Sequence, residues 1–168
     1  MTISIYDLSI PVLTRGLSNL SSILDKAAAH AAAKKFDPAA LAQARLFPDM
    51  FPLTRQVQIT CDTAKGAAGR LAGIDIPKHE DTETTLDELK QRIAKTLDFV
   101  KSVKAEQMKG AESKTIELKF PSRTISFTGL SYLMNFVLPN FFFHESMTYA
   151  LLRSSGVEVG KMDFLGAE

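Results

Sequence analysis

The sequence predicts an all-α protein, an up-down four-helix bundle with a short β-hairpin between the third and fourth helices. Two observations lead to this fold class. Apolar residues recur every three or four positions over four long stretches, as they do on the buried face of a helix. One stretch before the last of them alternates polar and apolar residues, which is typical of strands. The 168 residues, 45% of them hydrophobic, fit a single domain over residues 1–168.

The first helix is expected over residues 8–34, where Pro11 fits the first turn or gives a slight kink. The second helix starts with Pro52 in its first turn and ends at Gly73, since proline suits the first turn of a helix and glycine its C-cap. Its apolar face, which includes Cys61, is rich in small residues. Another helix can therefore approach this face closely.

The third helix is expected to begin at Thr84 or Thr85, where a hydroxyl caps the first turn and the acidic residues that follow suit the helix dipole. Its apolar stripe continues to about Met108. The other side carries basic residues, which we expect on a solvated face. These are Arg92, Lys95, Lys101 and Lys104.

Residues 114–120 and 124–127 alternate with period two around a turn at residues 121–123, so they predict the hairpin. Two strands alone are marginally stable. The hairpin is therefore expected to lie against the helices.

The last helix is expected from Thr128 to Gly156, with a kink near Pro139. A run of phenylalanines makes it apolar nearly all round, as expected of the most buried helix or of a subunit interface. The tail is expected to fold back, so that Phe164 and Leu165 close one end of the bundle.

Composition excludes several classes of function. The chain has 20 Lys and Arg against 19 Asp and Glu, which argues against nucleic acid as a partner. Its single cysteine cannot form an intrachain disulfide and suits a reducing cytoplasm. We see no signal peptide and no stretch of about 18 apolar residues that would span a membrane. Glycine-rich phosphate loops, zinc-protease motifs and nucleophile-elbow serines are also missing from the sequence.

His144 and Asp62 are the catalytic candidates. His144 lies in an apolar stretch, where it serves either as a ligand or acid–base group or as a buried histidine bonded to a neighbour. Asp62 lies at the centre of the second helix, where it is either at the surface or paired with Lys65, Arg55 or His144. An Asp62–His144 pair would raise the pKa of the histidine and form an acid–base couple.

Short motifs from the second helix to the tail carry a resemblance to a known family. In chain order they are Leu46-Phe47-Pro48-Asp49-Met50, Gln56-Val57, Cys61-Asp62-Thr63-Ala64-Lys65, Arg70-Leu71-Ala72-Gly73, Pro139-Asn140 with His144, Tyr149-Ala150-Leu151-Leu152-Arg153, Gly156-Val157, Gly160-Lys161 and Asp163-Phe164-Leu165-Gly166. Together they resemble DUF1993, a bacterial family of unknown function that is related in fold to the DinB/YfiT-like metalloenzymes. The resemblance covers nearly the whole chain and implies a DinB-like four-helix bundle that is often dimeric.

Active members of the wider superfamily bind a divalent metal through three histidines, one on the second helix and two that lie four residues apart on the last. The resemblance implies that His144 matches the first histidine of the last-helix pair, whereas Thr148 stands in the place of the second. On the second helix the candidates are Gln58, Ile59 and Thr60.

A divalent ion requires three or four imidazole, thiolate or carboxylate donors. We therefore expect neither metal nor cofactor. If zinc or nickel binds, His144 would hold it together with Glu145, Cys61 or Asp62.

Three functions remain open. The first is a cytoplasmic small-molecule-binding protein that has lost the three-histidine site, with ligand-binding residues His144, Tyr149, Thr148, Gln58 and Cys61. The second is a divalent-metal-dependent transferase or hydrolase that uses His144. The third is a structural homodimer with the phenylalanine run in its interface. Whether the protein is an enzyme, and which small molecule it takes, is left open by the sequence.

Overall fold

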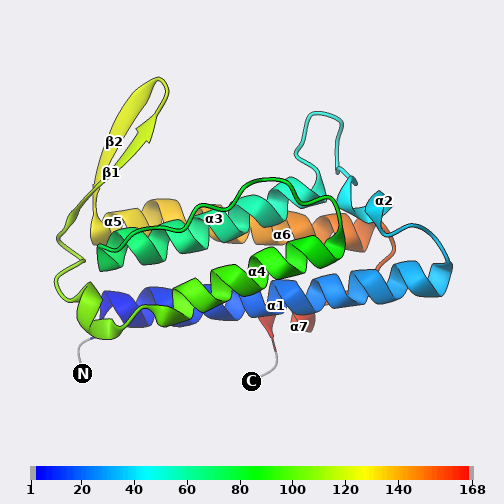
Figure 1. Cartoon of the computed structure of the whole chain (residues 1–168), viewed down its shortest axis with the longest axis horizontal. Coiled ribbons are helices and arrows are strands. Elements are labelled where there is room, and N and C mark those ends of the chain that lie inside the picture. Colours follow the sequence, from blue (N-terminus) through cyan, green and yellow to red (C-terminus); the bar gives the residue numbers. More distant parts are fainter. Residues whose placement is uncertain (1–2, 167–168) are drawn as a thin grey trace.

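The computed structural model describes residues 3–166, which form helices and one two-stranded antiparallel sheet. Four long helices lie side by side: α1 (Ile5–Lys34), α3 (Leu53–Ala72), α4 (Leu86–Ser102) and α6 (Leu138–Ser154) (Figure 1). The shorter elements are α2 (Ala39–Ala42), η1 (Ala105–Met108), β1 (Thr115–Phe120), β2 (Arg123–Thr128), α5 (Gly129–Tyr132), η2 (Leu133–Val137) and α7 (Lys161–Leu165). Within residues 3–166, no helix has the length and apolar character needed to cross a bilayer.

Local capping signals set where two of the long helices begin. Thr85 caps α4 in a capping box with Glu88, as the sequence predicts. Ser4 caps α1 in the same way with Asp7, which starts this helix three residues earlier than its apolar pattern indicates. Pro11 consequently lies inside α1, beyond the first turn.

Helices α3 and α4 run in the same direction, so the predicted up-down order is wrong. Residues 73–85, the return segment, run back along α3 from its end to its start (Figure 1). Gln58 donates a hydrogen bond to Glu83 at 2.9 Å, and a Cβ at Gly69 would lie 2.4 Å from Ile76. Thirteen extended residues reach about 40 Å, whereas a 20-residue helix is about 30 Å long. The link can therefore return the chain to the end where α3 began, and the order is up-down-down-up.

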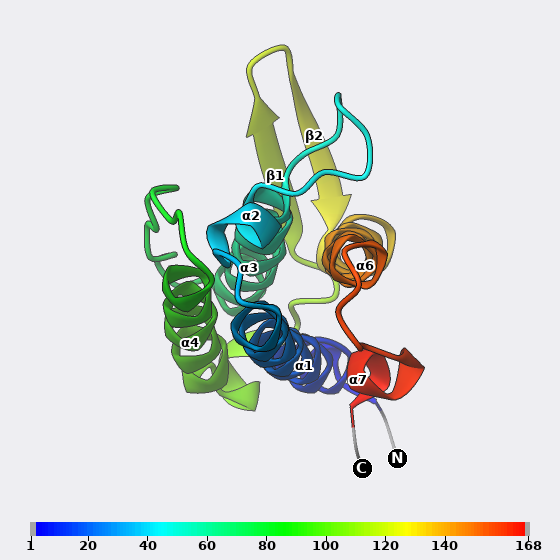
Figure 2. The same cartoon turned by 90° about the vertical axis from the view of Figure 1, so that its right-hand side faces the viewer.

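Helix α3 is the most enclosed helix, with fifteen of its twenty residues buried. It lies between α1, α4 and α6 (Figure 2), and the return segment covers a further side. The last helix was expected to be either the most buried one or part of a subunit interface, and the first alternative is wrong, because α6 leaves Phe142 36% and Phe143 52% exposed. The small residues of α3 allow the close approach that the sequence predicts, since Ala64, Ala67 and Ala68 are all buried.

The last helical stretch is continuous through α5, η2 and α6, and η2 is a turn of π-helix. Pro139 lies in the first turn of α6. Its ring would clash with the carbonyl four residues earlier, that of Asn135, which belongs to the π-helical turn. The wider winding of a π-helix accommodates this proline. The structure thus accommodates Pro139 with a π turn at the site where the sequence predicts a kink.

The hairpin pairs Thr115 with Thr128 and Phe120 with Arg123. Its base is covered, with Ile116 buried and Phe127 against Tyr132, whereas its tip projects away from the helices (Figure 2). The expectation that it lies against the helices therefore holds for its base.

The tail does not close an end of the molecule. Helix α7 lies against the middle of α1 (Figure 1), where the Asn19 side chain donates to the Phe164 carbonyl at 2.9 Å and Lys26 pairs with Asp163 at 2.7 Å. It covers the groove between α1 and α6, because Tyr149 of α6 packs edge-on against Phe164.

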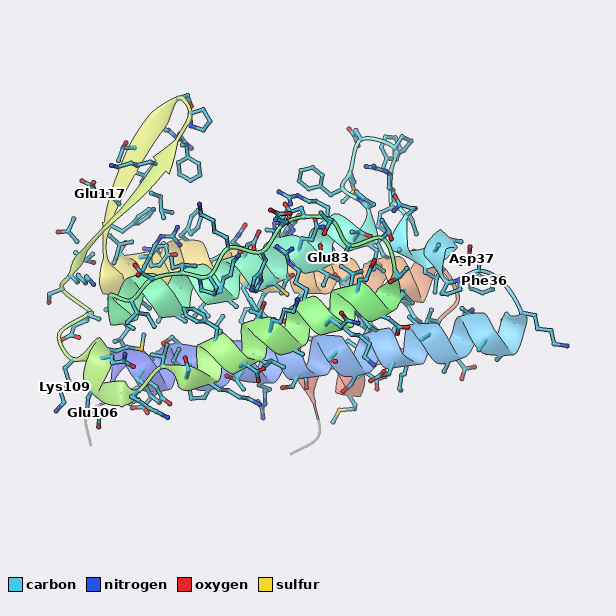
Figure 3. The ribbon with its side chains drawn as sticks, viewed as in Figure 1. Phe36, Asp37, Glu83, Glu106, Lys109 and Glu117 are labelled. Carbon is cyan, nitrogen blue, oxygen red and sulfur yellow. The ribbon has the colours of Figure 1, made fainter. Side chains whose placement is uncertain are left out.

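Arg92 joins three parts of the fold. Its guanidinium lies 2.8 Å from Asp62 of α3, 2.9 Å from Asp81 and 3.0 Å from Glu83, the last of which is labelled in Figure 3. The residue is 2% exposed, so its predicted place on a solvated face is wrong. The cause is the return segment, which covers this side of α4 and supplies two of the carboxylates.

The same contacts make the fold sensitive to acid. Burial raises the pKa of Glu83, but the hydrogen bonds from Gln58 and Arg92 outweigh it, and the pKa lies below its ordinary value. This stabilisation is complete above the unfolded-state pKa of about 4.5 and is lost as the pH falls through the lower folded-state pKa.

We expect Arg92→Ala to lower the free energy of unfolding by about 3 kcal/mol at neutral pH, because it leaves the buried side of Glu83 without its cation and takes one of two cations from Asp62 and from Asp81. Urea denaturation followed by circular dichroism measures the change. Lys101→Ala, exposed near the end of the same helix, is the matched control and should change stability by less than about 0.5 kcal/mol. Equal stability of the two variants would contradict the role given to Arg92.

Candidate functional site

His144 projects from α6 toward α3, where it meets Gln56. The two atoms His144 Nδ1 and Gln56 Oε1 are 2.7 Å apart, and Gln56 Nε2 donates to the Phe51 carbonyl at 3.2 Å. An amide oxygen only accepts hydrogen bonds, so Nδ1 of His144 carries the proton and Nε2 does not. Burial, and next the charge of Arg55, lower the pKa of His144 below its ordinary value. At neutral pH it is a neutral, buried, hydrogen-bonded ring.

The surroundings of His144 do not fit a divalent metal. Gln56, which the sequence offered as part of a family motif and not as a site candidate, faces His144, whereas Gln58 turns to Glu83 of the return segment. The Thr148 hydroxyl donates to the His144 carbonyl of its own helix at 3.1 Å. Nowhere in the described part of the chain do three or more His, Cys, Asp or Glu side chains gather closely enough to hold an ion. One imidazole, one amide already hydrogen-bonded at both ends and one hydroxyl are a poor donor set for zinc or nickel.

Asp62 does not pair with His144. It lies 2.8 Å from Arg92 and 3.0 Å from Lys65, so of the suggested partners it takes Lys65 and adds one that was not foreseen. The reason is helical geometry. Six residues separate Asp62 from Gln56, which places them about 120° apart around α3 at about 100° per residue. Gln56 faces α6 while Asp62 faces α4, and the acid–base couple does not form.

The remaining candidates lie apart from one another. Cys61 is fully buried, and burial raises the pKa of its thiol to about 12, which makes it an unreactive core residue. Tyr149 packs against Phe164 and donates to the Val159 carbonyl at 3.4 Å. Of the five predicted ligand-binding residues, His144 and Thr148 lie one turn apart on α6, and Gln58 and Cys61 lie one turn apart on α3. Tyr149, Gln58 and Cys61 face other elements.

A different residue has the properties of a functional site. Glu145 is 1% exposed, and neither of its carboxylate oxygens has a hydrogen-bond partner among the described residues. It lines a cavity of about 450 Å³ between α1, α6 and α7. The residues around this cavity are Pro11, Val12, Arg15, Gly16, Asn19, Phe142, Glu145, Phe164 and Leu165. We call it the Glu145 cavity.

Gly16 lets the carboxylate lie against α1. A Cβ at this position would lie 3.1 Å from Glu145 Oε2 and 2.5 Å from a ring carbon of Phe141. Burial raises the pKa of Glu145 to about 7. Arg15, the one other charged group in the cavity lining formed by residues 3–166, is exposed and does not pair with Glu145. The carboxyl group therefore changes its charge close to neutral pH.

The sequence contained a signal for this site. Glu145 falls on the buried face of its helix together with Phe141 and Leu152, at spacings of four and seven residues. A carboxylate at such a position is unusual, because acidic side chains are seldom fully buried without a partner.

The fold and sequence agree with one family. A DinB family member from Shewanella denitrificans has a crystal structure with a TM-score of 0.90 to this one and 43% sequence identity, covering 97% of this chain and 92% of that chain. No curated protein matches the chain. The sequence profile of DUF1993, a domain of unknown function, matches residues 5–165. This confirms the resemblance in the sequence motifs, and the chain belongs to the DUF1993 family.

Proposed function

We propose that this protein is a small-molecule-binding member of its family, a DinB-like four-helix bundle that has lost the three-histidine metal site of the wider superfamily. The observation that carries the proposal is Glu145, a buried carboxylate without a partner among the described residues that lines a half-open cavity. A cytoplasmic location fits a chain whose lone cysteine is a buried thiol.

The Glu145 cavity has the character of a ligand site. Small-molecule sites typically enclose about 300–1,000 Å³, with mostly apolar walls and a few polar groups that fix orientation. Val12, Phe142 and Phe164 supply apolar walls here, and Glu145 supplies a polar group. A shifted pKa inside a cavity is a further indication of a functional site. An unpaired buried carboxylate costs stability, and a ligand that pairs with it would recover that cost.

The surroundings of His144 support the loss of the three-histidine metal site. Gln56 accepts from His144 and donates to Phe51, so both ends of its amide are occupied by protein groups. This arrangement fixes the histidine ring as a link between α6 and α3. The divalent-metal-dependent transferase or hydrolase that uses His144 is the alternative, and it would need ligands from outside this arrangement.

A fragment screen followed by two-dimensional amide NMR tests the proposal. We expect small organic fragments to shift the signals of Gly16, Phe164 and Leu165, which surround the Glu145 cavity. Val12→Phe should fill the cavity from α1 and weaken this binding at least about tenfold. Ala33→Phe, exposed near the far end of α1, is the matched control and should bind as the wild type does.

Two outcomes would contradict the proposal. One is a screen in which no fragment shifts the cavity residues. The other is stoichiometric zinc or nickel in protein purified without a histidine tag, lost in His144→Ala, which would favour the metal-dependent enzyme.

A specific surface favours a second role, that of a homodimer. The helical stretch from α5 to α6 exposes four large apolar side chains: Leu130 (43%), Met134 (47%), Phe142 (36%) and Phe143 (52%). Leu130 and Met134 are four residues apart and therefore share one side of the stretch, and Phe142 and Phe143 follow about two turns later. Several exposed apolar side chains on one helical stretch are typical of interaction sites. The phenylalanine run would then form part of a subunit interface.

Sedimentation velocity tests the homodimer. We expect the wild-type chain to sediment as a dimer at micromolar concentration and Met134→Glu to shift it toward the monomer, since a charge in an apolar interface is costly. Met162→Glu, which alters an exposed methionine on α7, is the matched control and should leave the dimer intact. A wild-type monomer throughout the micromolar range would count against this role.

A further inference from the structure

We infer that the Glu145 cavity binds a small organic monoamine, whose ammonium group pairs with the Glu145 carboxylate while its apolar body packs against the cavity walls. This inference rests on the proposed function and names the ligand class of the same site.

The first argument comes from the two oxygens of Glu145. An ionised carboxylate only accepts hydrogen bonds, so its partner must bring N–H or O–H donors. Neither oxygen finds a donor among the described residues, and Gly16 stands beside Oε2 without a side chain. A primary ammonium group brings three donors and a positive charge. It would satisfy both oxygens and compensate the buried charge in one contact.

The second argument comes from the walls. Beyond the carboxylate the cavity is bounded mainly by apolar side chains, among them Val12, Phe142, Phe164 and Leu165. Such walls favour a hydrocarbon or aromatic body over a sugar or another polyol, whose hydroxyl groups would lose water without gaining partners. Phenylalanine rings also attract a nearby cation.

The third argument comes from the charges around the cavity. Arg15 lies on its α1 wall and is exposed, so it would repel a second positive charge on the ligand. On α7 the one acidic side chain, Asp163, is paired with Lys26, and on α6 His144 faces α3. The ligand therefore carries one ammonium group, and the site disfavours polyamines.

The inferred binding depends on pH. Glu145 must be ionised to pair with the ammonium, and burial raises its pKa to about 7 in the free protein. Simple alkylamines stay protonated at neutral pH, as lysine does with its pKa of about 10.4. Affinity should therefore rise about tenfold from pH 6 to pH 8, in proportion to the ionised fraction of Glu145.

Isothermal titration calorimetry with three probes tests the inference. The probes are 2-phenylethylamine, 2-phenylethanol as its neutral counterpart, and 1,4-diaminobutane as a diamine. We expect 2-phenylethylamine to bind about tenfold more tightly at pH 8 than at pH 6, and at least about tenfold more tightly than either other probe at pH 8.

Variants identify the group responsible. Glu145→Gln keeps the shape of the side chain and should weaken amine binding at least about tenfold and remove its pH dependence. Glu117→Gln, which alters an exposed glutamate on β1, should leave binding unchanged. Arg15→Ala should raise the affinity for 1,4-diaminobutane, because it removes the repelling charge.

Several results would overturn the inference. Amine binding that is equally tight in Glu145→Gln, or independent of pH, would remove Glu145 as the partner. If 2-phenylethanol bound as tightly as the amine and shifted the same NMR signals, the ligand class would be wrong while the cavity remained a binding site. If neither probe bound, the monoamine would be excluded, and the proposed function would be decided by the fragment screen.

Discussion

Helix α3 is enclosed by protein on nearly every side, and the rest of the structure depends on how its polar side chains are satisfied there. Three of its neighbours supply a partner. His144 of α6 bonds to Gln56, and Arg92 of α4 pairs with Asp62. The return segment receives a hydrogen bond from Gln58. The contacts of Arg92 and Gln58 depend on the return segment, which runs back along α3 and lets α4 run parallel to it. The same path of the chain therefore satisfies buried polar groups and sets the order of the helices.

Glu145 is an exception to this rule, and the one in which both oxygens of a carboxylate are unpartnered; single atoms of Thr14, His79 and Arg92 also lack a partner among the described residues. Glu145 follows His144 on α6, but the histidine faces α3 and finds a partner, whereas the glutamate faces α1 and finds none. Its raised pKa means that the folded protein binds more protons than the unfolded chain between about pH 4.5 and 7. Stability therefore falls as the pH rises through that interval, by an amount on the order of 3 kcal/mol once Glu145 is ionised. A cost of this size is consistent with a group that is held ready for a ligand.

The sequence predicts what is encoded locally and misses what depends on how the helices are arranged. Thr85 caps the start of α4 and Gly73 caps the end of α3, as predicted, because a cap acts within one turn of its helix. Arg92 was wrongly expected in solvent. It is the path of the return segment that buries this residue, and the local sequence does not reveal that path. The contact between Gln56 and His144 was missed, because it depends on how α3 and α6 are rotated and in which register they pack. Glu145 shares a helix face with Phe141 and Leu152, but its position in the sequence does not show that the carboxylate lacks a partner.

The central claim is that the buried carboxylate of Glu145, rather than the ring of His144, lacks a hydrogen-bond partner among the described residues. The most direct measurement is a pH titration of the Glu145 side-chain carboxyl carbon by ¹³C NMR in the free protein. The account predicts a pKa of about 7, well above the ordinary value of a glutamate side chain. A pKa near the ordinary value of about 4.3 would mean that the carboxylate is solvated or paired, and would contradict the account.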